Sequence, residues 1–321
     1  MTQFSALRWL GAGYRLSMRD LNSKYEAVRA EKIQLNEAKM AVRNRWIWFC
    51  GWMFLSSLLF ARSLMLFVRV SLSNDDISYV FLIPLISVWF LFIERRKIFQ
   101  DVSFDTEFGG CILILGATTA VASRVMGGVS SVDLQLSGYI LSLVLFWLAG
   151  FALFYGRAAV KAGCFPLGLL FLMVPPPSFL LDRIVYLLQA GSAWITEALF
   201  DLFHVPALRE GFVFHLARVD IEVAKECSGI RSSMALLILA LLATHFTLKS
   251  FWKKALFLAC GLFMMILKNG IRIAILTLLA MYVDPGFLYG KLHHRGGIVF
   301  FLIGLVLLLP VLLFLQRSER K

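Results

Sequence analysis

Long apolar runs separated by short charged loops dominate the pattern of this sequence. Eight runs cover, approximately, residues 46–68, 79–93, 109–126, 134–155, 164–174, 230–248, 255–283 and 297–315. A helix needs roughly 20 apolar residues to cross the hydrocarbon core of a bilayer. The pattern therefore predicts an all-α polytopic membrane protein with about eight transmembrane segments, of which the fifth is short.

A further apolar stretch, residues 179–203, is less uniform than these runs. It follows three consecutive prolines, which end a helix because proline has no amide donor. Its interrupting polar residues are Asp182, Arg183, Gln189 and Glu197. The stretch is long enough to span, but an interfacial or re-entrant helix is equally consistent with it.

The periodicity changes between this stretch and the sixth run. Residues 211–216 and 219–223 are short and partly alternating, with a turn near Ala217 and Arg218. This pattern predicts a small β-hairpin. Open strand edges are not tolerated in lipid, so we expect the hairpin to lie outside the bilayer, directly before Cys227.

Composition and charge agree with a membrane protein. The 321 residues are 60% hydrophobic and only 16% charged, whereas soluble domains carry about 25% charged residues. The net charge of +12 comes mainly from Lys and Arg in the N-terminal tail and the short loops. Membrane topology requires that distribution, so we expect the lipid bilayer, and no nucleic acid, as a partner.

The first 44 residues are polar and basic and contain no secretory h-region. They predict a cytoplasmic tail or amphipathic helix over residues 1–44, followed by a membrane domain over 45–321. With this tail in the cytoplasm, the positive-inside bias predicts a multi-pass inner (cytoplasmic) membrane protein whose two termini are both cytoplasmic. Residues 175–227 and 284–296 would then face outward, provided that 179–203 does not fully span.

The polar residues around Cys227 are the first candidate for chemistry. Glu226, Cys227 and Ser228 stand just before the sixth run, and Arg231 follows one turn later on the same helix face. The thiolate is the reactive form of cysteine, and a helix N-terminus favours it. Cys227 is therefore a candidate nucleophile at the outer face.

Two further candidates lie beyond it. Asn269 and Arg272 stand inside the seventh run, where an ionisable residue is costly and function is the default hypothesis. Arg272 could stabilise an oxyanion, and His293 in the next outer loop could act as general acid and base. The five cysteines form no CxxC pair and show no zinc-ligand spacing, so no metal or cofactor is expected.

Structural roles remain open for these residues. Arg272 could pair with Glu226, Asp284 or a backbone carbonyl, and His293 could be a solvated loop residue with His294 as its direct rival. Depth is also a difficulty, since Arg272 lies 11 residues before Val283, about 16 Å along a straight helix. A shared site would need a helix break near Asn269-Gly270 or a polar cavity below the surface.

At these residues the chain resembles the exosortase/archaeosortase family of membrane cysteine transpeptidases, over most of residues 75–316. The stretch from Glu226 to Ser232 is similar to the nucleophile motif of that family. Asn269-Gly270-Ile271-Arg272 is similar to its N-x-x-R motif, and His293 with Gly297 to its histidine motif.

The resemblance implies that membrane-anchored substrate proteins are recognised by a C-terminal sorting signal. Such a signal has a short motif such as Pro-Glu-Pro, a transmembrane helix and a basic tail. Cys227 would form a thioester, Arg272 would stabilise the transition state and His293 would transfer protons. Two other functions stay open: a non-catalytic assembly factor in exopolysaccharide export, and a transporter.

Overall fold

The computed structural model describes residues 44–73, 79–126, 131–217, 219–225, 230–288 and 297–319. The chain divides into two compact units, residues 1–55 and 56–321, and each is described by itself. The described part of the first unit is a single helix. This helix begins at Asn44 and ends at Leu59, four residues after the boundary between the units in the sequence.

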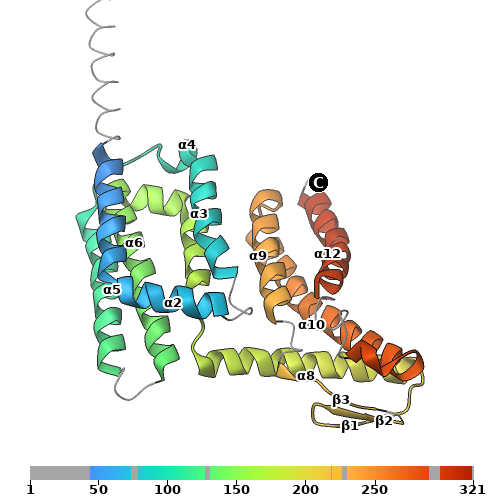
Figure 1. Cartoon of the computed structure of the whole chain (residues 1–321). Coiled ribbons are helices and arrows are strands. Elements are labelled where there is room, and N and C mark those ends of the chain that lie inside the picture. The colour runs from blue at the N-terminus through green and yellow to red at the C-terminus, as the bar shows by residue number, and fades with distance from the viewer. Residues whose placement is uncertain are drawn as a thin grey trace, which may run out of the picture. The chain divides into compact units, whose positions relative to one another are not determined.

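The second unit is built mainly from helices, as the apolar runs predict (Figure 1). The α-helices described are α2 (Ala61–Ser73), α3 (Leu82–Ile93), α4 (Arg95–Ile98), α5 (Thr106–Met126), α6 (Val132–Ala162), α7 (Cys164–Leu169), α8 (Ser178–Leu202), α9 (Ile230–Thr247), α10 (Phe251–Tyr282) and α12 (Gly297–Glu319). The short 3-10 helices are η2 (Leu170–Met173) and η4 (Pro285–Leu288).

Within the described part of the chain, the structure supports several membrane spans. Four helices are long and apolar enough to cross a membrane, and counting each bent helix pair as one span gives up to six. The multi-pass character is confirmed, but the count of about eight is not. The first apolar run, predicted to be continuous from 46 to 68, is broken near Phe60.

The predicted hairpin is present and forms part of a three-stranded antiparallel sheet. β2 (Val213–Leu216) pairs with β3 (Asp220–Glu222), and β1 (Ala207–Glu210) adds to the other edge of β2. The sequence analysis missed β1, because its charged residues Arg209 and Glu210 make it read as a polar loop.

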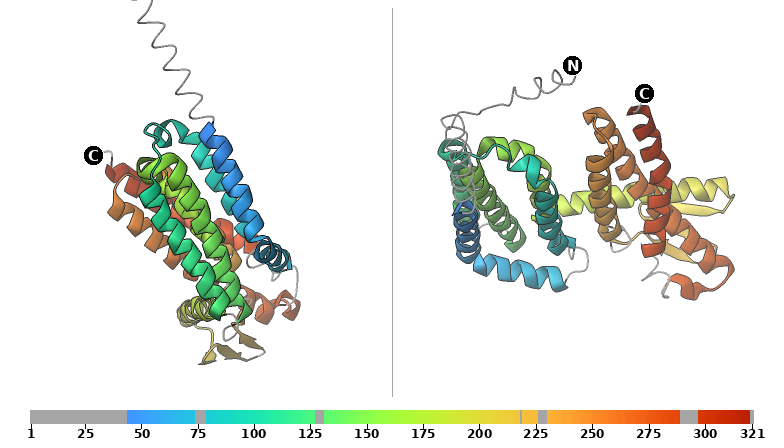
Figure 2. Two further views of the ribbon diagram at one scale, coloured as in Figure 1. Left: turned by 90° about the vertical axis from the view of Figure 1, so that its left-hand side faces the viewer. Right: turned by 90° about the horizontal axis from the view of Figure 1, so that it is seen from above.

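Close helix packing joins α5 to α6, which run side by side in both views (Figures 1 and 2). Gly109 of α5 lies against Leu153 of α6 so closely that an added Cβ would be 2.8 Å from the Leu153 backbone nitrogen. Gly156 interrupts α6 with a φ of 82°, a conformation that favours glycine. α5 and α6 therefore form a closely packed helical hairpin, and Gly156 kinks α6 just beyond the close contact at Leu153.

Three polar contacts join the helix ends that carry basic clusters. His245 at the end of α9 contacts Glu94 at the end of α3. Glu319 at the end of α12 accepts hydrogen bonds from the backbone N–H groups of Lys249 and Ser250, at 2.8 and 2.9 Å. The helix termini next to 95–97, 249–254 and 317 are therefore held at one end of the second unit.

The basic residues Arg157 and Lys161, near the end of α6, belong to the same end. A Cβ built at Gly163, two residues after Lys161, would lie 3.5 Å from Ile98 of α4. Figure 1 accordingly draws α4 and the C-terminus at one end, with α8 and the sheet at the other. The clustering of positive charge at one end agrees with the positive-inside interpretation.

α8 takes a course different from that of the spanning helices. The short α7–η2 segment and α8 are bent by 96° at the break that contains the three prolines. Figures 1 and 2 both show α8 running across α9 and α12 rather than alongside them. Such a course favours an interfacial or re-entrant helix over a span.

Adjacent glycines in α5 provide a matched test of the α5–α6 packing. Gly109→Ala should lower the free energy of unfolding by about 1–3 kcal/mol, since the new methyl group overlaps Leu153. Gly110→Ala, which has nothing within 4 Å, should be neutral or stabilise by up to about 1 kcal/mol through helix propensity. Thermal unfolding of the two variants in detergent measures the difference, and equal stabilities would contradict the packing.

Candidate functional site

A polar seam joins the middle of α10 to α8. The Asn269 side-chain amide donates a hydrogen bond to the Ser192 hydroxyl at 3.0 Å, and the Thr196 hydroxyl reaches the Gly270 carbonyl at 3.2 Å. A Cβ at Gly270 would lie 2.6 Å from Cβ of Ile195. Glycine at this position therefore lets the two helices approach closely.

α10 is continuous through Asn269-Gly270, as a 32-residue helix from Phe251 to Tyr282. The helix break that would have brought Arg272 to the surface is therefore absent. Of the two conditions that the sequence analysis set for a shared site, the break near Asn269-Gly270 is not met, and Gly270 instead allows close packing against α8.

α9 and α10 form an antiparallel pair whose register is given by two contacts. A Cβ at Gly261 would lie 3.7 Å from that of Ala240, and the Lys268 ammonium donates a hydrogen bond to the Ser232 hydroxyl at 2.6 Å. Residue numbers at equal height thus add up to about 500 in both contacts.

This register removes the depth problem. α10 continues for 14 residues beyond Lys268, whereas α9 begins only two residues before Ser232. Arg272 therefore lies past the N-terminal end of α9, about 6 Å beyond Lys268 at 1.5 Å per residue. The residues between Arg272 and the end of α10 belong to the part of α10 that extends past α9. Arg272 therefore does not lie below the start of α9.

The sheet is fixed to the same stretch of α10. Val223, which follows β3, belongs to one buried cluster with Ile273 and Ala274 of α10. Its carbonyl accepts a hydrogen bond from the Gln189 side chain of α8 at 2.7 Å. The chain is thus anchored to α8 and to the α10 region near Arg272 just before the stretch that contains Cys227.

Both sides of that stretch are held at α10. Val223 lies in the cluster that contains Ile273, and Ser232 is bonded to Lys268. Lys225, two residues after Val223, also forms an ion pair with Asp182 of α8 at 3.2 Å.

Most of the predicted site residues lie outside the part of the chain that the structure describes. These are Glu226, Cys227, Ser228, His293 and His294, and Arg231 is described only through its backbone. Arg272 is half-buried and Asn269 is buried. The grouping of Cys227, Arg272 and His293 therefore stays a prediction.

Lys268 is a residue whose importance the sequence analysis missed. It is only 2% exposed although it is charged. The available signal was a lysine inside a long apolar run, beside the more noticeable Asn269 and Arg272. A buried charge of this kind is costly and indicates a specific role.

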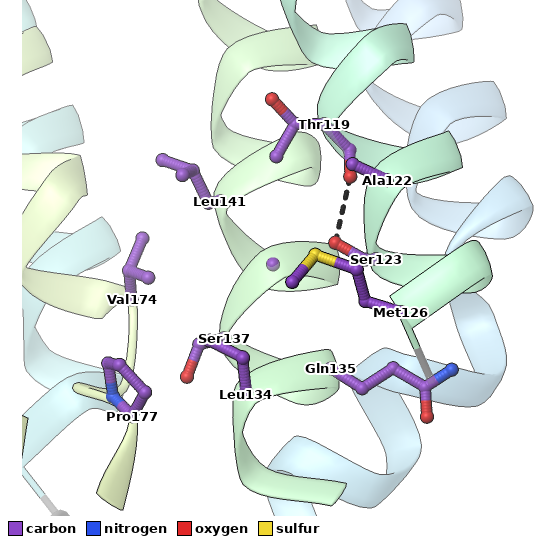
Figure 3. Close-up of a pocket in the computed structure, with 11 residues that line it drawn as sticks. Thr119, Ala122, Ser123, Met126, Leu134, Gln135, Ser137, Leu141, Val174 and Pro177 are labelled. Atoms are coloured by element: carbon purple, nitrogen blue, oxygen red, sulfur yellow. Dashed lines mark hydrogen bonds between the residues drawn. The ribbon is translucent and has the colours of Figure 1, made fainter. Parts of the chain in front are cut away.

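A cavity of about 280 Å³ lies apart from these residues, between α5, α6 and the segment that leads into α8. Figure 3 shows Ser123, Ser137 and Met126 around it, with Val174 and Pro177 on the facing side. Its walls are mainly apolar, and none of the candidate catalytic residues lines it.

Comparison with known families identifies the class of this protein. A family model described as transmembrane exosortase matches residues 71–310, about three quarters of the chain, and the chain belongs to this family. A search of curated proteins and a search of solved structures gave no match. The chain is thus a multi-pass membrane protein of a family that processes C-terminal sorting signals and whose members are generally cysteine transpeptidases.

The anchor of Val223 on α8 can be tested by substitution. Gln189→Leu leaves the Val223 carbonyl without its donor, so the free energy of unfolding should fall by about 1–3 kcal/mol. Ser142→Ala is the control, because the Ser142 hydroxyl bonds only to Gly138 of its own helix. Thermal unfolding and limited proteolysis compare them, and equal resistance would show that the anchor contributes nothing.

Proposed function

We propose that this exosortase-family protein is a cysteine protease/transpeptidase that cleaves C-terminal sorting signals at the outer face of the inner membrane. Family membership supports the substrate class. The single structural observation that supports the site is the antiparallel register of α9 and α10. That register places Arg272 one turn beyond the Lys268–Ser232 contact and past the start of α9, which Cys227 precedes in the sequence.

Cys227 is the proposed nucleophile. Its thiolate attacks the carbonyl carbon of the scissile peptide bond, and the carbonyl oxygen becomes an oxyanion. The Arg272 guanidinium stabilises this negative charge, since a fixed cation in a site that excludes water acts strongly on developing charge. Asn269 supports Arg272 by holding α10 on α8 through Ser192.

His293 is the proposed acid and base, with His294 as its rival. Protonated, it gives its proton to the leaving amine when the C–N bond breaks, and a thioester to Cys227 remains. Neutral, it then takes a proton from the second nucleophile, an amine or water, which attacks the thioester carbonyl. The Cys227 thiolate leaves, and the enzyme returns to its first state.

Glu226, Ser228 and Arg231 are proposed to support this centre or contact the substrate, because they flank the nucleophile. The substrate helix would lie in the bilayer beside the enzyme, with its scissile bond at the outer surface. We expect neither metal nor cofactor to take part. Residues 1–44 are proposed to form a cytoplasmic tail outside the catalytic membrane domain of 45–321.

The proposed orientation can be tested at two described, exposed positions. In a chain whose native cysteines are replaced, Glu222→Cys in β3 should react with a membrane-impermeant maleimide added to intact cells. Arg96→Cys in α4 should react only after the membrane is opened, since α4 lies at the end with the basic clusters. The reverse pattern would invert the topology and contradict an outward-facing site.

Catalysis is tested with a co-expressed membrane protein that carries a C-terminal sorting signal. Cys227→Ala should abolish its processing, and Arg272→Gln should slow it about 100- to 1,000-fold because the oxyanion loses its cation. Cys111→Ala and Cys164→Ala, at exposed free cysteines, should process normally. Immunoblotting of precursor and product gives the rates.

Processing that continues in the Cys227→Ala strain would contradict the enzymatic function. The assembly-factor and transporter functions would then be favoured, because neither needs this thiol.

A further inference from the structure

Lys268 connects three helices at one point. Its ammonium donates to Ser232 in the first turn of α9 at 2.6 Å. A Cβ at Gly304 of α12 would come within 3.3 Å of Cδ of Lys268, so the glycine leaves room for the lysine stem. The α9, α10 and α12 backbones are thus all held around this one side chain.

Along the sequence, the three candidate catalytic residues lie in or close before the same three helices. Cys227 stands three residues before α9, Arg272 lies one turn beyond Lys268 in α10, and His293 stands four residues before α12. A change of spacing at Lys268 would therefore move the starts of α9 and α12 relative to Arg272.

The burial of the Lys268 side chain indicates a role beyond packing. Among the described residues, no carboxylate lies within 4.0 Å of its nitrogen, and its nearest charged neighbour along α10 is the cation Arg272. An apolar residue of similar volume would avoid the cost of burying a charge. What lysine adds is a directional bond that fixes the axial position of α9 against α10.

We propose that Lys268 is a positioning residue of the transpeptidase reaction, which aligns the starts of α9 and α12 with Arg272 through its bond to Ser232 and its contact at Gly304. This proposal rests on the proposed function. It assigns no contact with substrate to Lys268. When Lys268 is changed, all the site residues are still present, but the starts of α9 and α12 are no longer aligned with Arg272. The proposal predicts that this misalignment slows the chemical step.

The test uses purified full-length protein in detergent and a substrate with a sorting signal. Lys268→Met should lower kcat about 10- to 100-fold with KM within about twofold, since small misplacement of reacting groups costs rate rather than binding. Lys268→Arg keeps a cationic donor and should recover part of kcat. Thr277→Val, which removes a buried hydroxyl bonded only within α10, should leave kcat unchanged.

A double-mutant cycle separates the bond from general damage. Ser232→Ala should lower kcat as Lys268→Met does, and the double variant should be no slower than Lys268→Met alone, because the two substitutions remove the same bond. Effects that multiply, or a loss confined to KM, would overturn the positioning role. So would Lys268→Arg being no faster than Lys268→Met.

The outcome is distinguishable from failure of the proposed function. If Cys227→Ala still processes substrate, the enzymatic proposal fails whatever Lys268 does. If Cys227→Ala is inactive but Lys268→Met and Ser232→Ala behave like Thr277→Val, only the positioning role is wrong.

Discussion

The close approach of α8 to α10 at Gly270 is the contact on which the arrangement of α8, α10 and the sheet depends. It brings the Asn269 amide to Ser192 and sets α8 across α10. Gln189 of α8 then donates a hydrogen bond to the Val223 carbonyl, and this bond holds the sheet against α8. A side chain at Gly270 would separate the helices, and the seam, the sheet anchor and the level of Arg272 would all be lost together.

The bilayer constrains the opposite end in a different way. There is no water inside the hydrocarbon core to satisfy charged groups, so basic clusters and helix caps collect where the helices leave it. Glu319 accepts from the amides that open the α9–α10 turn, and Glu94 pairs with His245. These contacts join α3 to α9, and α12 to the α9–α10 turn, at the end opposite α8 and the sheet.

Sequence patterns predicted what depends on local composition. The apolar runs, the proline break before α8 and the strands of the hairpin all follow from periodicity, and the structure contains them. Sequence patterns did not predict the role of a residue where that role depends on a contact with a residue far along the chain. The sequence around Gly270 does not show that this glycine packs closely against Ile195. The charges of Arg209 and Glu210 are typical of a loop, but both residues pair with β2. The register of α9 against α10 likewise cannot be predicted from the sequence of either helix alone.

That register also changes what Arg272 requires. Measured from the end of its own helix, it was too deep for a site at the membrane surface. Measured from the start of α9 it is not deep, because α10 is longer than its partner and α8 covers the excess. α10 thus carries Arg272 past the start of α9, into the region where α8 and the sheet pack against α10.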